Sequence, residues 1–395
     1  MILDAEVKSG GNPVQGLSSL STPKRFVFTG DFLRSNAAGT RPTQHHNIRW
    51  LKNLVSYQIG AATGLEQNTI CWNAPPHVTD GALNSADVRR IYGAFSLPVN
   101  IESWAMIHNI ETSPPRVSSF IQELFRDSFV IAFEMSPAVE RILTAGGIPW
   151  VNVTIHPVRF LDDLLLGLKS NVPEVQQAIA KYKIPEGFVQ LGAGVQKATA
   201  ARSFDAHARP NSALFLMQTW YDQSQIKNGR FVGPLDFMDD ITAFAGQFSE
   251  FLVKEHPLEK HPAVPIMAAL IPNMRIVTGN AYSFMSIPEI STVATLSSGT
   301  ATEARYFSKD ARFFYKPSVE LYRQEGDNPA AYVGVMDEFL STDFWRDVLS
   351  PLIEVSPKDG YSMPFKPNRL RTSLRSFWNF NEIDTDVAVR AAKVA

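Results

Sequence analysis

A serine pair and a glutamate in the second half of the chain have the types and spacing to bind an anion. Ser297 and Ser298 follow a β-branched run, residues 290–295, and precede a helical pattern that contains Glu303. The first N–H groups of a helix have no partner inside it, and the helix dipole favours negative charge there. Serine hydroxyls can turn toward phosphate oxygens, and a glutamate can accept hydrogen bonds from ribose hydroxyls. The stretch therefore predicts a phosphate and polyol site, and the alternative is an ordinary turn with a helix N-cap.

Two carboxylates, Asp222 and Glu134, each follow a run typical of a buried strand. Asp222 lies in the loop 218–224 after the apolar run 212–217, and Glu134 directly follows the apolar run 129–133. Functional side chains gather at the carboxyl ends of strands in open α/β sheets, so both are candidate catalytic groups. The alternatives are an Asx-turn for Asp222 and a helix N-terminal acid for Glu134.

Histidines provide a third kind of group. His256-Pro257 follow the apolar run 251–253, and His261-Pro262 form a second pair of the same kind, which leaves the register of this motif open. His256 is preferred because of the apolar run before it. His45 and His46 are adjacent in a helical pattern and point in different directions, without a Cys, His or carboxylate cluster beside them. They predict no metal site.

The elements that must position these groups alternate between strands and helices, which indicates an α/β fold. Strands are expected at 25–30, 129–134, 150–155, 212–217, 274–278 and 290–295, and helices at 44–60, 138–143, 160–168, 173–182 and 235–253. The expected division of the chain is a tail at 1–22, a first domain at 23–170, an inter-domain helical region at 171–211, a second domain at 212–360 and a C-terminal segment at 361–395. The apolar spacing in 369–380 predicts that this last segment packs back on the first domain.

Composition excludes several classes of protein. Of the 395 residues, 45% are hydrophobic and 19% charged, which suits a chain with a substantial core. The net charge of −2 and the lack of a Lys/Arg run argue against a nucleic-acid partner. A single cysteine, Cys71, rules out an intramolecular disulfide and a Cys-rich metal site. The start lacks a signal-peptide pattern and no apolar run reaches about 18 residues, so a cytoplasmic protein is expected.

Three of these pieces, in order, carry a resemblance to a known family. The loop 218–224, the pair His256-Pro257 and the pair Ser297-Ser298 with Glu303 resemble bacterial glycosyltransferases that use CMP-sugars. The fuller pattern resembles most the retaining β-Kdo transferases of capsule, O-antigen and lipopolysaccharide assembly. It covers 212–310 well and the first half only at Glu134 and around 155–161. The resemblance implies a GT-B architecture, in which two Rossmann-like domains face each other across a cleft.

The resemblance also implies a role for each site residue. Asp222 would be the nucleophile, and Glu134 would align or deprotonate the acceptor. The CMP phosphate and ribose would be bound by His256, Ser297, Ser298 and Glu303. Further substrate contacts are implied for Gln218, Ser224 and Arg159. Transfer is expected to need no metal and no cofactor.

The implied partners are the donor CMP-Kdo and an oligosaccharide or lipid-linked saccharide acceptor. Such a protein would work at the inner face of the cytoplasmic membrane, as a peripheral protein or in an assembly complex. Two other functions stay open: an inverting, sialyltransferase-like enzyme, and a non-catalytic subunit that binds a nucleotide or sugar.

Overall fold

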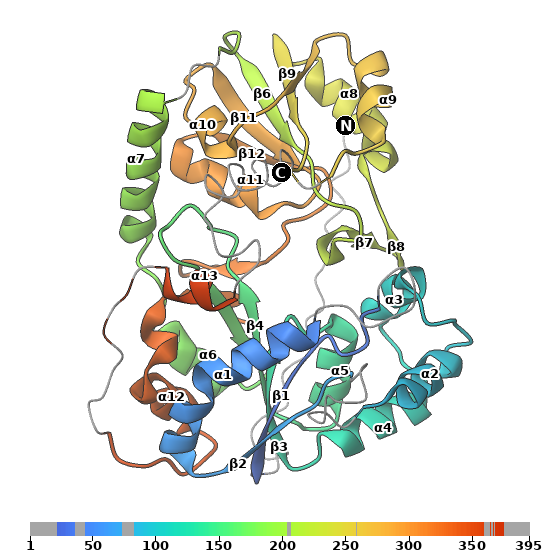
Figure 1. Cartoon of the computed structure of the whole chain (residues 1–395), viewed down its shortest axis with the longest axis vertical. Coiled ribbons are helices and arrows are strands. Elements are labelled where there is room, and N and C mark those ends of the chain that lie inside the picture. The colour runs from blue at the N-terminus through green and yellow to red at the C-terminus, as the bar shows by residue number, and fades with distance from the viewer. Residues whose placement is uncertain are drawn as a thin grey trace, which may run out of the picture.

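The structure is a computed structural model, and it describes residues 22–35, 44–72, 83–203, 207–257, 259–358, 364, 366 and 368–374. Two large sheets, one of seven strands and one of five, form the framework of the described part (Figure 1). Helices cover both faces of each sheet, so the chain has a mixed α/β fold dominated by parallel strands. No helix in these ranges is both long and apolar enough to span a membrane.

The seven-stranded sheet has the order β13-β14-β5-β4-β3-β1-β2. Its strands are β1 (Arg25–Gly30), β2 (Glu66–Thr69), β3 (Ser128–Phe133), β4 (Trp150–Ile155), β5 (Leu166–Ser170), β13 (Leu321–Tyr322) and β14 (Tyr332–Val335). The neighbours β2, β1, β3 and β4 are parallel, whereas β5 is antiparallel to both β4 and β14.

Helices lie on both faces of this sheet. One face is covered by α1 (Gln44–Thr63), α6 (Pro173–Ala180) and α12 (Thr342–Leu349), and the other by α2 (Ser85–Ala94), α3 (Ile101–His108), α4 (Pro115–Leu124) and α5 (Pro137–Ala145). In β1, Phe26 and Phe28 enter one core and Val27 enters the other. Burial on both faces explains why these strands read as nearly continuous apolar runs.

The five-stranded sheet is entirely parallel and has the order β10-β9-β6-β11-β12. Its strands are β6 (Ser212–Leu216), β9 (Glu250–Lys254), β10 (Met274–Val277), β11 (Ile290–Thr295) and β12 (Asp310–Phe313). One face is covered by α7 (Glu186–Ser203), α10 (Ala281–Met285) and α11 (Gly299–Ala304), and the other by α8 (Met238–Ala245) and α9 (Ala263–Leu270).

The chain passes between the two sheets several times. The connection from β4 to β5 buries Phe160, Leu161 and Leu165 in a core of the five-stranded sheet. The hairpin of β7 (Ile226–Lys227) and β8 (Arg230–Phe231) buries Ile226 in a core of the seven-stranded sheet. Residues 321–349 also return to the seven-stranded sheet, although they belong to the domain predicted at 212–360. The two halves therefore share more chain than a division into consecutive segments suggests.

Two predicted helices are wrong. The stretch 160–168 is an irregular connection followed by β5, because its apolar side chains enter two different cores, Leu164 in one and Leu165 in the other. In the stretch 235–253, α8 ends before Gly246 and the chain forms β9 from Glu250. Apolar side chains in β9 alternate between two cores, a period of two that a helix cannot satisfy.

The C-terminal helix α13 (Arg369–Leu374) packs on the first half of the chain. Leu370 joins the core on the α1 face, and the Trp50 Nε1 group donates a hydrogen bond of 2.8 Å to Ser373 Oγ. The Asp163 carboxylate accepts from the backbone N–H groups of Leu370 and Arg371 at 2.9 and 3.0 Å. The predicted crossing back of residues 375–380 lies outside the described residues.

Candidate active site

The carboxyl ends of the three central strands in the five-stranded sheet lie next to one another. Leu216 in β6 pairs with Lys254 in β9, and Phe215 in β6 pairs with Ala294 in β11. The loops that follow these strands carry Asp222, His256 and Ser297. Three stretches separated by many residues in sequence are thus brought to one sheet edge, where ligands bind in parallel α/β sheets.

A chain of hydrogen bonds connects four predicted site residues at this edge. The Gln218 amide oxygen accepts from the Ser297 N–H at 2.9 Å and from its hydroxyl at 3.2 Å. The Ser297 and Ser224 hydroxyls are 2.8 Å apart, and Ser224 donates to Asp222 Oδ1 at 2.8 Å. The Ser224 N–H also donates to Asp222 Oδ1, at 2.9 Å. Asp222 therefore caps a short 3-10 turn, and one of its oxygens has a fixed position.

The two serines of the pair have different surroundings. Ser297 is completely buried, and both its N–H and its hydroxyl contact Gln218. Ser298 is half-buried and caps α11, where its Oγ accepts from the Thr300 N–H at 3.3 Å. A phosphate oxygen can reach the Ser297 hydroxyl only if an internal hydrogen bond gives way, whereas Ser298 lies closer to the surface.

Glu303 connects the two halves of the chain. Its side chain is 1% exposed, and Oε1 accepts from the Arg159 backbone N–H at 2.6 Å and from the Tyr282 hydroxyl at 3.0 Å. Arg159 lies after β4 of the seven-stranded sheet, whereas Glu303 and Tyr282 lie on α11 and α10. The carboxylate therefore holds the loop that positions Arg159.

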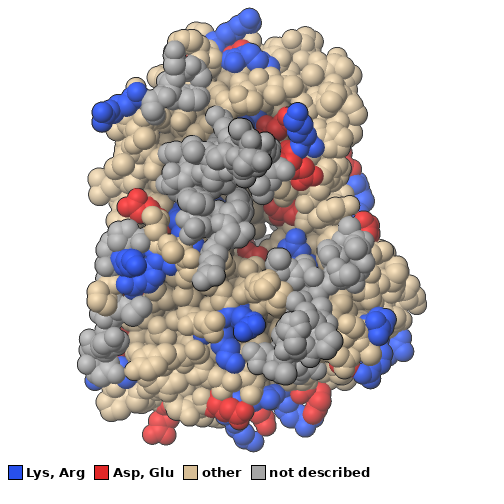
Figure 2. Space-filling view, viewed as in Figure 1, with Lys and Arg blue, Asp and Glu red and all other residues tan. Residues whose placement is uncertain are grey.

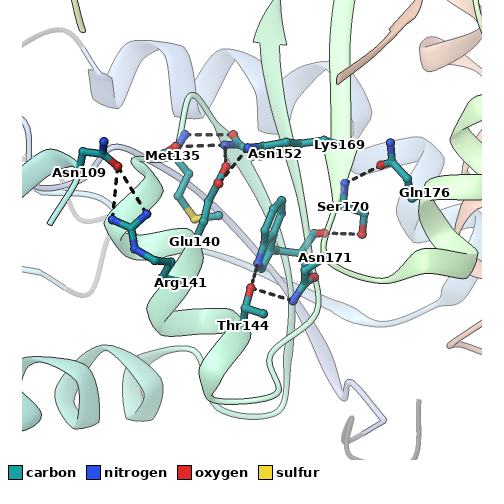
Figure 3. Close-up of polar contacts among 11 residues, drawn as sticks. Asn109, Met135, Glu140, Arg141, Thr144, Asn152, Lys169, Ser170, Asn171 and Gln176 are labelled. Atoms are coloured by element: carbon teal, nitrogen blue, oxygen red, sulfur yellow. Dashed lines mark hydrogen bonds and ion pairs between the residues drawn. The ribbon is translucent and has the colours of Figure 1, made fainter. Parts of the chain in front are cut away.

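Glu134 lies one residue beyond β3, in a backbone conformation with φ of 50°. A positive φ is unusual for a non-glycine residue and requires support from the surroundings. Asn152, completely buried on β4, provides this support: its side chain accepts from the Met135 N–H at 3.0 Å and donates to the Met135 carbonyl at 3.1 Å (Figure 3). The Asn152 amide also bonds Glu140, which pairs with Lys169 at 2.9 Å. The turn that carries Glu134 is thus held in place by the Asn152 side chain of β4.

Charged side chains from both halves converge at the site. Burial raises the pKa of Glu134, Arg159 opposes this shift, and the Asp222 carboxylate adds to it. Burial lowers the pKa of His256 to about 4, and the charges of Asp222 and Arg159 also act on this imidazole. Asp222 and Arg159 therefore lie within electrostatic range of both Glu134 and His256. The imidazole of His256 is neutral at pH 7 and can donate one hydrogen bond.

The second His-Pro pair has different contacts. The His261 ring stacks on Trp220 with ring centroids 4.7 Å apart, and its Nδ1 accepts from the Ala263 N–H at 3.1 Å. The acidic groups that act on its pKa are Glu259 and Glu255, after burial. His261 thus supports the start of α9, and the surroundings favour His256 as the site histidine.

Sequence reasoning missed two residues at this junction, Asp31 and Arg34. Asp31 directly follows β1 just as Glu134 directly follows β3, and Gly30 pairs with Phe133 across the two strands. Arg34 donates from Nη2 to the Tyr221 carbonyl of the other half at 3.3 Å, next to Asp222. A signal was present: the run 25–30 ends on Gly30 and is followed by Asp31, a carboxylate at a strand end of the kind that marked Glu134.

Within the described ranges, no three or more His, Cys, Asp or Glu side chains are grouped to hold a metal ion. His45 and His46 lie on α1 with ring centroids 3.7 Å apart, so the expectation that these side chains point in different directions is wrong. On the face shown in Figure 2, the Lys and Arg side chains of the described residues are scattered among Asp and Glu and do not gather in one broad patch.

Comparisons with known proteins give little beyond this geometry. No family model matches the chain, and no curated protein matches it. One solved structure that it resembles is KpsC, the β-Kdo 2,7-transferase of Thermosulfurimonas dismutans, with 11% identity and a TM-score of 0.37 over 60% of this chain and 81% of that chain. At this TM-score the similarity carries no argument about residues or activity.

Proposed function

We propose that the chain is a glycosyltransferase that transfers Kdo from CMP-β-Kdo to a saccharide hydroxyl with retention of configuration. One observation carries the proposal. Two carboxylates from different halves, Asp222 and Glu134, lie within electrostatic range of each other, and the Arg159 charge acts on both Glu134 and His256. A nucleophile and a base on different halves, with a cation and a hydrogen-bond donor near them, suit group transfer from an anionic donor. The two α/β halves would then form a GT-B enzyme.

The leaving group of such a donor is a phosphate monoester, so the site must stabilise negative charge as the bond to the sugar breaks. We assign this task to the Arg159 guanidinium, the His256 ring N–H and the half-buried Ser298 hydroxyl. Ser297 contributes by holding Gln218, unless its hydroxyl is released to the phosphate. The buried Glu303 holds the Arg159 backbone and would reach the ribose only if these internal bonds open.

Retention follows from two displacements. In the first, Asp222 Oδ2 bonds to the anomeric carbon while the bond to the CMP phosphate oxygen breaks, and the electron pair leaves with CMP. In the second, the acceptor oxygen bonds to the anomeric carbon, the ester bond to Asp222 breaks, and its electron pair returns to the carboxylate. Glu134 takes the acceptor proton, and its raised pKa makes it a stronger base than an ordinary glutamate. Oδ2 is chosen because Ser224 holds Oδ1.

A second candidate is an inverting, sialyltransferase-like transfer. The observation that favours it is the capping role of Asp222, whose Oδ1 accepts two hydrogen bonds from Ser224. An aspartate held in this way can position a donor hydroxyl without attacking the sugar. Glu134 would then act as base in a single displacement.

Trapping the intermediate separates the two mechanisms. The chain is incubated with CMP-Kdo without acceptor, digested, and the peptides are weighed. We expect one Kdo mass on the peptide that contains Asp222, and no such mass in Asp222→Asn. The matched control, Asp239→Asn, changes an exposed aspartate in the first turn of α8 and should still form the adduct. Full transfer activity in Asp222→Asn, or a product of inverted configuration, would refute the double displacement.

A further inference from the structure

Asp31 is a buried carboxylate at the junction of the two halves. It is 1% exposed and lies directly after β1, whose last residue Gly30 pairs with Phe133, the residue before Glu134. Asp31 and Glu134 thus follow neighbouring parallel strands at the same level. Ligands bind at these carboxyl ends in open α/β sheets.

The two oxygens of Asp31 differ in their contacts. Oδ2 accepts a hydrogen bond of 2.8 Å from Trp104 Nε1, whereas Oδ1 is buried and accepts none in the part of the chain that the structure describes. The Leu33 N–H also lowers the pKa of this carboxyl, although no donor meets hydrogen-bond geometry at Oδ1 among the described residues. A buried acceptor without a donor destabilises the folded state, so it needs an explanation.

The surroundings link Asp31 to both proposed catalytic groups. The Arg34 charge acts on Asp31 and on Glu134, and the Arg34 guanidinium bonds the carbonyl of Tyr221, the neighbour of Asp222. The guanidinium also lies 4.8 Å from the Trp104 ring. Asp31 Oδ1, which accepts no hydrogen bond among the described residues, is therefore near the place where the acceptor must approach Glu134.

We propose that Asp31 binds the acceptor: its Oδ1 accepts a hydrogen bond from a second acceptor hydroxyl, beside the hydroxyl that Glu134 deprotonates. This inference rests on the proposed transferase function and deepens it. The acceptor is then a saccharide with two neighbouring hydroxyl groups at the transfer site. Because Oδ1 is buried, a group as small as a hydroxyl is the partner that suits it.

The test separates the donor half of the reaction from the acceptor half. In Asp31→Asn the amide oxygen can keep the bond to Trp104, and the NH2 group takes the place of Oδ1. We expect unchanged adduct formation from CMP-Kdo, and a fall in kcat/KM for the saccharide acceptor of about 10- to 100-fold, as for the loss of a hydrogen bond to a charged group.

Deoxy acceptors identify the hydroxyl. The probes are the methyl hexoside that the native enzyme glycosylates fastest and its deoxy analogues that lack one neighbouring hydroxyl. With one of the deoxy analogues, kcat/KM of the native enzyme should fall by the same factor of about 10 to 100. The kcat/KM of Asp31→Asn should be nearly the same for that analogue as for the full acceptor. Equal losses in both proteins, normal acceptor kinetics in Asp31→Asn, or slower adduct formation would each overturn the proposal.

Two further variants guard against a fold defect. Asp87→Asn alters a buried aspartate that caps α2 in the same half, and its acceptor kinetics should stay native.

If Asp31→Asn does not fold, Trp104→Phe removes the donor to Oδ2 and keeps the carboxylate. It should raise the acceptor KM several-fold without slowing adduct formation, and an unchanged KM would refute the proposal. A native protein that neither binds CMP nor forms an adduct would refute the transferase function itself.

Discussion

At the scale of single residues, burial decides what each carboxylate can do. Asp31 and Glu134 have raised pKa values because burial penalises their charged forms. Glu303 is equally buried, but the Arg159 N–H and the Tyr282 hydroxyl donate to it. Three carboxylates of the same chemistry thus have different surroundings: two lie at the strand ends where we propose that the acceptor binds, and one holds a loop.

The raised pKa of Asp31 predicts a specific dependence of stability on pH. Burial raises this pKa to about 6, whereas an unfolded aspartate has a value of about 3.9. Between these values the folded state binds more protons, so the contribution of Asp31 to stability is present below about pH 4 and is lost as the pH rises through 6. Asp31→Asn lacks this loss, and its free energy of unfolding relative to the native protein should rise by about 2 kcal/mol from pH 4 to 7.

Urea unfolding of both proteins at several pH values measures this difference. Buried histidines such as His156 and His256, whose pKa values burial lowers to about 3 and about 4, change stability in the opposite direction. They are present in both proteins and cancel in the difference. A difference that does not change with pH would show that Asp31 is ionised at little cost.

At the scale of elements, the approach of α11 to the seven-stranded half depends on a glycine. A Cβ on Gly299 would lie 2.8 Å from the Pro157 Cβ and 3.1 Å from its Cα. Gly299 follows Ser298, the cap of α11, so Pro157 sits against the first turn of this helix. The turn therefore has a packing requirement besides any ligand that it binds.

Gly299→Ala is expected to destabilise the fold by about 1–3 kcal/mol, because overpacking forces backbone shifts. The matched control is Gly194→Ala in the interior of α7, where an added Cβ meets no atom within 4 Å. That change should stabilise by about 0.5–1 kcal/mol through helix propensity. Chemical unfolding of both variants measures the change in the free energy of unfolding, which should be negative for Gly299→Ala and positive for Gly194→Ala. Equal changes would contradict the role of the Pro157 contact.

At the scale of the whole molecule, the segment 158–163 joins the two halves. Its side chains Phe160 and Leu161 enter a core of the five-stranded sheet. Arg371 of α13, 2% exposed, donates from its guanidinium to the carbonyls of Arg159, Leu161 and Asp162. One arginine thus satisfies three backbone carbonyls of the loop that positions the Arg159 side chain.

Arg371→Ala should therefore destabilise the protein by about 2–4 kcal/mol, since buried carbonyls lose their donors. We also expect faster hydrogen exchange in 156–165 and weaker binding of CMP by calorimetry. The control Arg275→Ala removes the partner of Glu250, away from this loop, and should leave exchange in 156–165 unchanged. Native CMP affinity in a folded Arg371→Ala protein would exclude a role of the loop in binding CMP.

The sequence alone determined much of the local structure. Apolar runs buried on both faces marked β1, β3, β4, β6 and β11, and their ends located Glu134, Asp222 and Ser297. These signals are local: side-chain alternation and turn residues depend only on near neighbours in the chain. The same local signal gave a wrong prediction of a helix at 160–168, where the apolar side chains enter two different cores and do not form one face of a helix.

Only the tertiary structure decided which strand ends lie next to one another and which atoms form the hydrogen bonds between them. The Arg159–Glu303 bond spans 144 residues, and the Arg371–Arg159 bond spans 212. No pattern within a window of one helix or strand contains such contacts. For the same reason the sequence could propose Ser297 as a phosphate donor but could not place its hydroxyl against Gln218 and Ser224, because the direction of a side chain depends on what packs around it.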